Sequence, residues 1–250
     1  MATYIKGSIN KPLQFIDKLE PGDRIALFYE EPEYARMLVF HYLRIGLISG
    51  ERCIYLVADR IQAHDQVGEE QNNDEKKKSN KDMMSSNNNN NYELEFIKRE
   101  MADSEINVDR YLAQGSLYIG ICDTNLPLPY QKQASRKLGL EFFKIFLPKS
   151  FYSSNVLNSR AKRYRLVLDF KFELNMNPQQ ISHLQEFEQL YHPIYHSLTG
   201  SSICSYPVHN VEETLTDNSE YGQLITSRLK SHTGVIFARK FGKGLALGLE

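Results

Sequence analysis

The sequence has no excess of charge of one sign, few cysteines and no long hydrophobic run. The chain has 30 basic and 31 acidic residues, and the net charge of −1 gives no bias toward nucleic acid or an acidic membrane. The three cysteines, Cys53, Cys122 and Cys204, lie far apart without CxxC spacing, which predicts buried free thiols and not metal ligands or a disulfide. Because no run of 18 apolar residues occurs, we expect no membrane span. Together with the absence of a signal-peptide core at the N-terminus, this favours a cytoplasmic location.

A second absence concerns the junction IALFYEEPEYARML, residues 25–38, which reads as an apolar strand, a short polar turn and a helix. A phosphate-binding loop at such a junction works through backbone N–H groups freed by glycines and through a lysine. Between Phe28 and Tyr34 there is no glycine, lysine, serine or threonine, and Glu30, Glu31 and Glu33 would repel a triphosphate. The junction is therefore predicted not to bind nucleotide in the manner of a phosphate loop.

The same junction makes three structural predictions. Strand 25–29 should lie inside the sheet, because all five residues are apolar or aromatic. The free N–H groups of the following helix should be met by Glu31 or Glu33 from the protein itself. Tyr29 and Tyr34 should flank a cleft above the helix, although a plain helix cap without a cleft is the alternative.

Apolar strand-like runs alternate with helical patterns along the whole chain. This alternation predicts a single α/β domain over residues 1–250, with a mostly parallel sheet and helices on both faces in three layers. The predicted strands are 25–29, 53–58, 117–122, 165–170 and 202–206, followed by an antiparallel hairpin of 234–239 and 244–249. The predicted helices are 33–48, 93–113, 131–146, 178–197 and 219–231.

Residues 66–92, QVGEEQNNDEKKKSNKDMMSSNNNNNY, interrupt this alternation. The segment is polar, repetitive and almost without aliphatic side chains. It cannot bury enough surface to offset the entropy of ordering, so we predict a disordered low-complexity insertion within the domain.

Sequence features that suggest chemistry are few. The strand RLVLDF places Asp169 at its carboxyl end, as in the Walker B strand of an ATPase, where such an acid organises Mg²⁺. A solvated or capping aspartate is the more common role of this pattern. His192 and His196 have a spacing that can bind a metal, but no third ligand is evident, and we predict no metal site, no cofactor and no catalytic residues.

Four blocks of the chain resemble the MEDS domain, a sensory domain named from methanogens, methylotrophs and the DcmR regulator. The blocks are residues 22–59, with FYE, a long helix and then GERCIYL, and residues 165–170, 201–212 and 232–250. These domains are similar to degenerate RecA/KaiC-type ATPases, and the closing segments resemble archaeal versions. The resemblance implies a RecA-like fold, a cytoplasmic sensory role and small, hydrocarbon-like ligands. It implies no catalytic residues.

Ligands of open parallel sheets bind outside the carboxyl ends of the strands. That edge should collect an acidic and aromatic set of candidate ligand-binding residues: Tyr29, Glu30, Glu31, Tyr34, Asp59, Asp123, Asp169, Tyr206 and His209. Such a set suits a cationic, polar or apolar small molecule and does not suit ATP.

We therefore predict a non-catalytic sensory module that binds a small molecule at this edge and acts on a regulatory protein partner in trans. Many MEDS-like domains carry a DNA-binding or kinase module, whereas here Glu250 directly follows the last strand. No direct binding to nucleic acid or membrane is expected. The alternatives are a protein-interaction domain without a ligand and a divergent ATP-binding protein.

Overall fold

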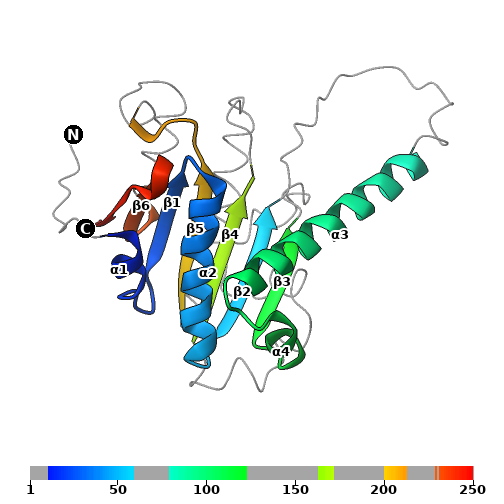
Figure 1. Cartoon of the computed structure of the whole chain (residues 1–250), viewed down its shortest axis with the longest axis horizontal. Coiled ribbons are helices and arrows are strands. Elements are labelled where there is room, and N and C mark those ends of the chain that lie inside the picture. Colours follow the sequence, from blue (N-terminus) through cyan, green and yellow to red (C-terminus); the bar gives the residue numbers. More distant parts are fainter. Residues whose placement is uncertain are drawn as a thin grey trace, which may run out of the picture.

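A mixed, mostly parallel β-sheet forms the centre of the molecule (Figure 1). The computed structural model describes residues 11–58, 79–122, 163–171, 200–212, 229 and 231–249. Within these residues the strand order is β3-β2-β4-β5-β1-β6-β7. The strands are β1 (Arg24–Tyr29), β2 (Arg52–Ala58), β3 (Leu117–Cys122), β4 (Tyr164–Phe170), β5 (Gly200–Pro207), β6 (Gly234–Ala238) and β7 (Gly244–Gly248).

The strand pairing confirms the predicted fold class. All neighbours pair in parallel except β6 and β7, which form the antiparallel C-terminal hairpin. Strand β1 lies between β5 and β6, so the prediction that residues 25–29 lie inside the sheet is correct. A continuous apolar run suits this position, because side chains on both faces of a central parallel strand are buried.

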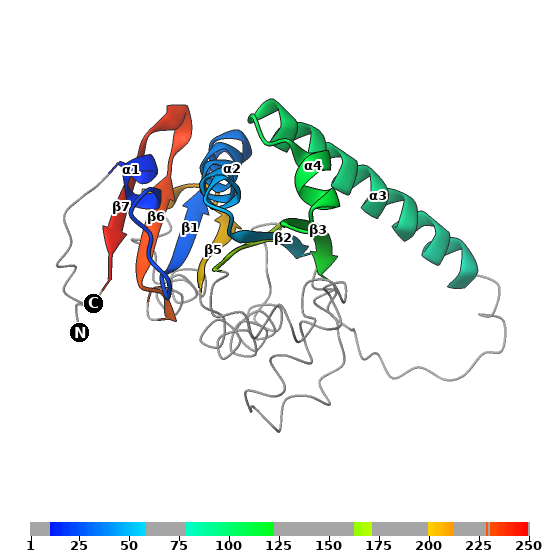
Figure 2. The same ribbon diagram turned by 90° about the horizontal axis from the view of Figure 1, so that it is seen from below.

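The described helices all cover the same face of the sheet (Figure 2). They are α1 (Pro12–Ile16), α2 (Pro32–Ile48), α3 (Ser79–Asp103) and α4 (Val108–Ala113). Helix α2 packs on the central strands, begins with a proline at its first position and is followed by Gly50 at a φ of 77°. The short helix α1 was not among the predicted helices.

Side chains on the second face are buried as well. Phe170, Tyr206, Phe28 and Phe237 come from four adjacent strands, and their rings stack in that order with centroids 5.0 to 5.7 Å apart. This burial agrees with a sheet that is covered on both faces. The helices predicted over 131–146 and 178–197, and nearly all of 219–231, lie outside the described residues.

The predicted helix 93–113 is two helices, α3 and α4, so its single span was wrong. Glu105 has a φ of 63°, which is incompatible with a continuing helix. Asn107 then caps α4, with its side chain accepting a hydrogen bond from the backbone N–H of Arg110 at 3.2 Å. Met101 and Ile106, on either side of the break, are both buried in the core, which keeps the two helices close to the sheet.

Helix α3 includes part of the predicted insertion 66–92. Residues 66–78 lie outside the described residues, whereas the backbone of 79–92 continues α3 toward its N-terminus and extends away from the body (Figures 1 and 2). The structure therefore differs from the expectation of an unstructured insertion in this second part. The helix is continuous there with residues 93–103, where Ile97 and Met101 are buried against the core.

Two further predictions can be compared with the described part of the chain. Cys53 and Cys204 are buried free thiols, as predicted. No described helix is both long enough and apolar enough to cross a membrane.

Candidate functional site

A cleft of about 310 Å³ lies at the carboxyl ends of β1, β4 and β5, beside the first turns of α2. One wall consists of Tyr29, Pro32, Ala35, Arg36 and Val39, from β1 and α2. The other lining residues are Tyr55, Phe96, Ile97, Asp169, Lys171, Ser205 and Pro207. The volume lies at the lower end of the range for small-molecule sites, and the lining is largely apolar with a few polar groups, as such sites usually are.

A buried aspartate lies at the base of this cleft. Asp169 is only 7% exposed and accepts two hydrogen bonds from neutral donors. The Tyr55 hydroxyl on β2 donates to Oδ2 at 2.6 Å, and the Ser205 hydroxyl on β5 donates to Oδ1 at 2.8 Å. The parallel pairing of β4 with β5 sets Asp169 directly opposite Ser205, so the sheet register produces this contact.

Burial is the largest influence on the pKa of the aspartate at the bottom of the cleft. It raises the pKa of Asp169 above the usual 3.8, and the hydrogen bonds from Tyr55 and Ser205 and the nearby charge of Arg36 offset this only in part. Burial and the proximity of Asp169 also raise the pKa of Tyr55 well above its usual range. The tyrosine therefore stays a neutral donor at physiological pH.

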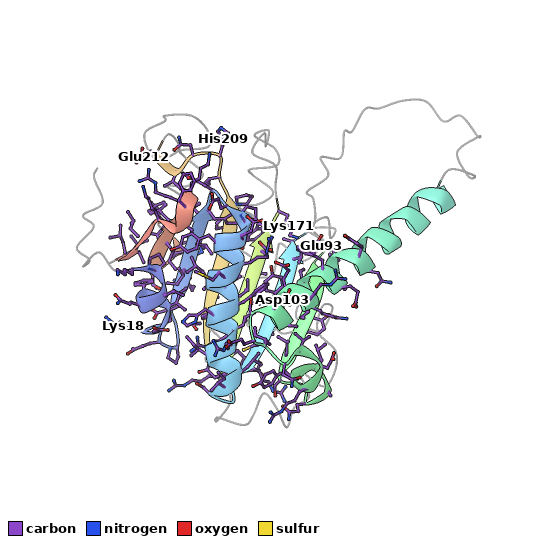
Figure 3. All side chains as sticks on the ribbon, viewed as in Figure 1. Lys18, Glu93, Asp103, Lys171, His209 and Glu212 are labelled. Atoms are coloured by element: carbon purple, nitrogen blue, oxygen red, sulfur yellow. The ribbon has the colours of Figure 1, made fainter. Side chains whose placement is uncertain are left out.

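Two cations, Arg36 and Lys171, line the cleft above the aspartate. Arg36 is paired with Glu33 at 3.1 Å and Glu100 at 3.3 Å, and its guanidinium lies 5.4 Å from the centroid of the Phe96 ring. Lys171 is paired with Glu93, and Figure 3 shows these two side chains next to each other at the end of β4. The sequence predicted an acidic and aromatic edge, so these cations correct its expected charge.

The acidic turn at residues 30–33 does not cap α2, which corrects the predicted role of its glutamates. Glu31 occupies the cap position without a side-chain cap hydrogen bond, and Glu33 pairs with Arg36. Instead, Glu30 accepts hydrogen bonds from the backbone N–H groups of Val211 and Lys240, both at 2.9 Å. The carboxylate of Glu31 accepts a hydrogen bond from the backbone N–H of Phe241 at 3.1 Å.

The pKa of Glu30 reflects this arrangement. Burial alone would raise it, but the backbone N–H donors of Val211 and Lys240, with the charges of Arg239 and Lys240, lower the pKa below 4.5. The carboxylate therefore stays ionised and holds two segments that are distant in sequence. The glutamates of this turn bind protein backbone, and neither of the two lines the cleft.

The predicted site residues thus fall into separate groups. Tyr29 and Asp169 line the cleft together. Tyr34 lies on the other side of α2, with its hydroxyl close to Gly244 of β7, so it does not flank the cleft. Tyr206 stacks between Phe28 and Phe170 on the opposite face of the sheet.

His209 is exposed and lies away from Lys171 and Glu93 (Figure 3), and Asp59 and Asp123 lie outside the described residues. The alternation of side chains along a strand explains the error at Tyr206. Asp169 is opposite Ser205 in the register, so the next residue of β5 must point to the other face.

Sequence reasoning missed Arg36, Tyr55, Phe96, Lys171 and Ser205. Tyr55 and Ser205 could have been found by asking which polar side chains share the Asp169 face of neighbouring strands. Lys171 and Phe96 line the same cleft because of how α3 packs, and the sequence offers no local signal for that packing. In the part of the chain that the structure describes, no cluster of histidine, cysteine or acidic side chains is arranged to hold a metal.

The chain was compared with protein families, curated proteins and solved structures. No family model and no curated protein matches it. Among solved structures it is similar to a KaiC-like protein from the hyperthermophilic archaeon Pyrococcus horikoshii, at 12% identity and a TM-score of 0.43. The match covers 88% of this chain and 73% of that protein. At this level the similarity says nothing about what this chain binds or does.

Proposed function

We propose that the protein is a non-catalytic sensory module that binds a small molecule in the cleft and signals to a protein partner in trans. The observation that carries this proposal is the cleft of about 310 Å³ built over a buried aspartate, at the sheet edge where ligands of parallel α/β proteins bind. The resemblance of four sequence blocks to the MEDS sensory domain supports the same role.

The groups at the base of the cleft favour binding over chemistry. Both oxygens of Asp169 are engaged by hydroxyl donors, which fixes the carboxylate in one orientation. Tyr55 and Ser205 each keep lone pairs that can accept a hydrogen bond from a ligand. Rings and aliphatic side chains around them supply the apolar contact surface.

Native mass spectrometry of the purified protein tests the proposal, because it shows retained ligand and subunit number together. We expect a mass excess in the wild type that is lost in Ala35→Leu, since Ala35 lines the cleft and a larger side chain fills it. Met37→Leu is the matched control, because Met37 lies on the same helix and is 42% exposed.

A companion thermal-shift screen covers ligands that are lost on purification. A small molecule should raise the melting temperature of the wild type and of Met37→Leu but not of Ala35→Leu. If no compound and no retained mass distinguishes Ala35→Leu from the other two proteins, the cleft is not a binding site. A protein-interaction domain without a ligand would then be the better description.

Divergent nucleotide binding is the second candidate, and the two cations of the cleft favour it. Against it, Arg36 and Lys171 are already paired with carboxylates, and the adjoining turn carries glutamates where a phosphate loop has glycine and lysine. We expect calorimetry to show no binding of ATP–Mg²⁺ at millimolar nucleotide. A micromolar dissociation constant would make the second candidate the correct one.

A further inference from the structure

Each of the two cations of the cleft has an acidic partner on the same helix. Lys171 is paired with Glu93 and Arg36 with Glu100, and both glutamates belong to α3. The two acids are seven residues apart, so they lie on the same face of the helix and reach the cleft together. Helix α3 thus provides the anions that a ligand would otherwise supply.

The two ion pairs differ in how firmly they are held. Arg36 contacts two carboxylates and the ring of Phe96. Lys171 and Glu93 have side chains 39% and 32% exposed. A partly exposed pair is held less firmly than a buried one, so an anion that reaches Lys171 can compete with Glu93.

The packing of α3 allows Glu93 to leave without unfolding the core. Ile97 and Met101 are buried and fix the C-terminal half of the helix. Glu93 lies one turn N-terminal to Ile97, next to Tyr92, which is 77% exposed. Toward its N-terminus the helix extends away from the body of the protein (Figure 2).

We propose that the cleft takes a small molecule with an anionic group on an apolar body, and that the anion replaces Glu93 on Lys171. The apolar body would lie against Tyr29, Val39 and Phe96, which line the same cleft. The inference rests on the proposed function and specifies its ligand class.

The absence of tryptophan from the chain makes a direct test simple. Phe96→Trp places a single tryptophan at the half-buried wall of the cleft, where titrations with benzoate, benzamide and benzylamine can be followed by its selectively excited emission. We expect benzoate to bind at least about tenfold more tightly than its neutral amide, as one charge-assisted contact provides.

Charge variants in this reporter background identify the contact. Glu93→Gln should tighten benzoate binding by up to about fivefold, because the competing carboxylate is gone. Lys171→Met should weaken it by about tenfold or more. Glu95→Gln is the matched control, because Glu95 pairs with Lys98 at 2.6 Å on the exposed side of the same helix and should leave the affinity unchanged.

The outcomes separate this inference from the proposed function. Equal binding of benzoate and benzamide, no effect of Glu93→Gln, or no benzoate binding to that variant overturns the anionic ligand class. If benzamide or benzylamine still binds and Ala35→Leu abolishes that binding, the cleft remains a ligand site of another class. If none of the three probes binds any variant and the thermal-shift screen is also negative, both proposals fail.

Discussion

Strand β4 carries a buried charged side chain near each end, and the two side chains have different kinds of partner. Arg165 and Asp169 are four residues apart, point to the same face and are each 7% exposed. At the first end, Arg165 donates to the carboxylate of Glu51 at 2.5 Å and to the backbone carbonyl of Tyr42 at 3.0 Å. At the second end, Asp169 is hydrogen-bonded by two neutral hydroxyls and lines the cleft.

The surroundings of the two ends show the same contrast. The guanidinium of Arg165 lies 4.8 Å from the centroid of the Tyr42 ring, and Gly46 of α2 leaves the space that the arginine occupies. That end is closed by opposite charge and packing. The Asp169 end opens into a cleft, and among the described residues its carboxylate accepts no hydrogen bond from a cation. A buried charge matched by a counter-ion indicates a structural element, whereas one held only by neutral donors indicates a site that can still bind something.

Arg165→Met should have the largest effect on stability. The substitution leaves the mostly buried carboxylate of Glu51 without its cation, and breaking a buried pair in this way costs about 3–5 kcal/mol of unfolding free energy. Urea denaturation followed by circular dichroism measures the change. A loss below about 1 kcal/mol would place this ion pair with the weak surface pairs and remove the contrast.

Gly46→Ala should have an intermediate effect at the same closed end. An added Cβ would lie 2.5 Å from Cδ of Arg165 and 2.9 Å from Sγ of Cys53, and overpacking costs about 1–3 kcal/mol. The gain in helix propensity offsets about 1 kcal/mol of this. We therefore expect a lower urea midpoint for Gly46→Ala. Gly248→Ala, where nothing lies within 4 Å of the added carbon, should not lower it.

Asp169→Asn should have the smallest effect, within about 1 kcal/mol at neutral pH, because the asparagine can still pair with both hydroxyls. The pH dependence is more informative. The folded-state pKa of Asp169 is raised above 3.8, so the wild type loses stability relative to the variant as the pH rises from 3.8 to the raised value. Above that value the difference should be constant.

Denaturant titrations of the wild type and Asp169→Asn at several acidic pH values measure this difference. A difference that does not depend on pH would show that burial leaves the aspartate pKa unchanged. If the wild type instead gained stability relative to the variant as the pH rises, Asp169 would have a strong cationic partner. The two ends of β4 would then be alike.

The strands were the most predictable part of this fold. Runs such as IALFY, CIYLVA and LYIGIC are apolar throughout, and the structure places strand boundaries within about a residue or two of them. The break between α3 and α4 was missed because Asn107 was read as part of one helical pattern. Its capping contact to Arg110 depends on the turn at Glu105, which has an unusual backbone conformation.

The site was predictable only in part. The strand-end rule correctly brought Tyr29 and Asp169 to one edge, because it depends only on parallel strands. Which face each side chain takes depends on the register, and a shift of one residue separates Ser205 from Tyr206. The contact between Lys171 and Glu93 depends on where α3 packs, which no local sequence pattern specifies.

The glutamates of the turn after β1 have a consequence for how this protein can change. A phosphate-binding loop offers hydrogen-bond donors from its own backbone, whereas this turn offers acceptors and receives donors from Val211, Lys240 and Phe241. Replacing Glu30 by glycine would leave two backbone N–H groups in other segments without their acceptor. Replacing either glutamate on the way to a phosphate loop would therefore weaken the anchoring of the segments around this turn.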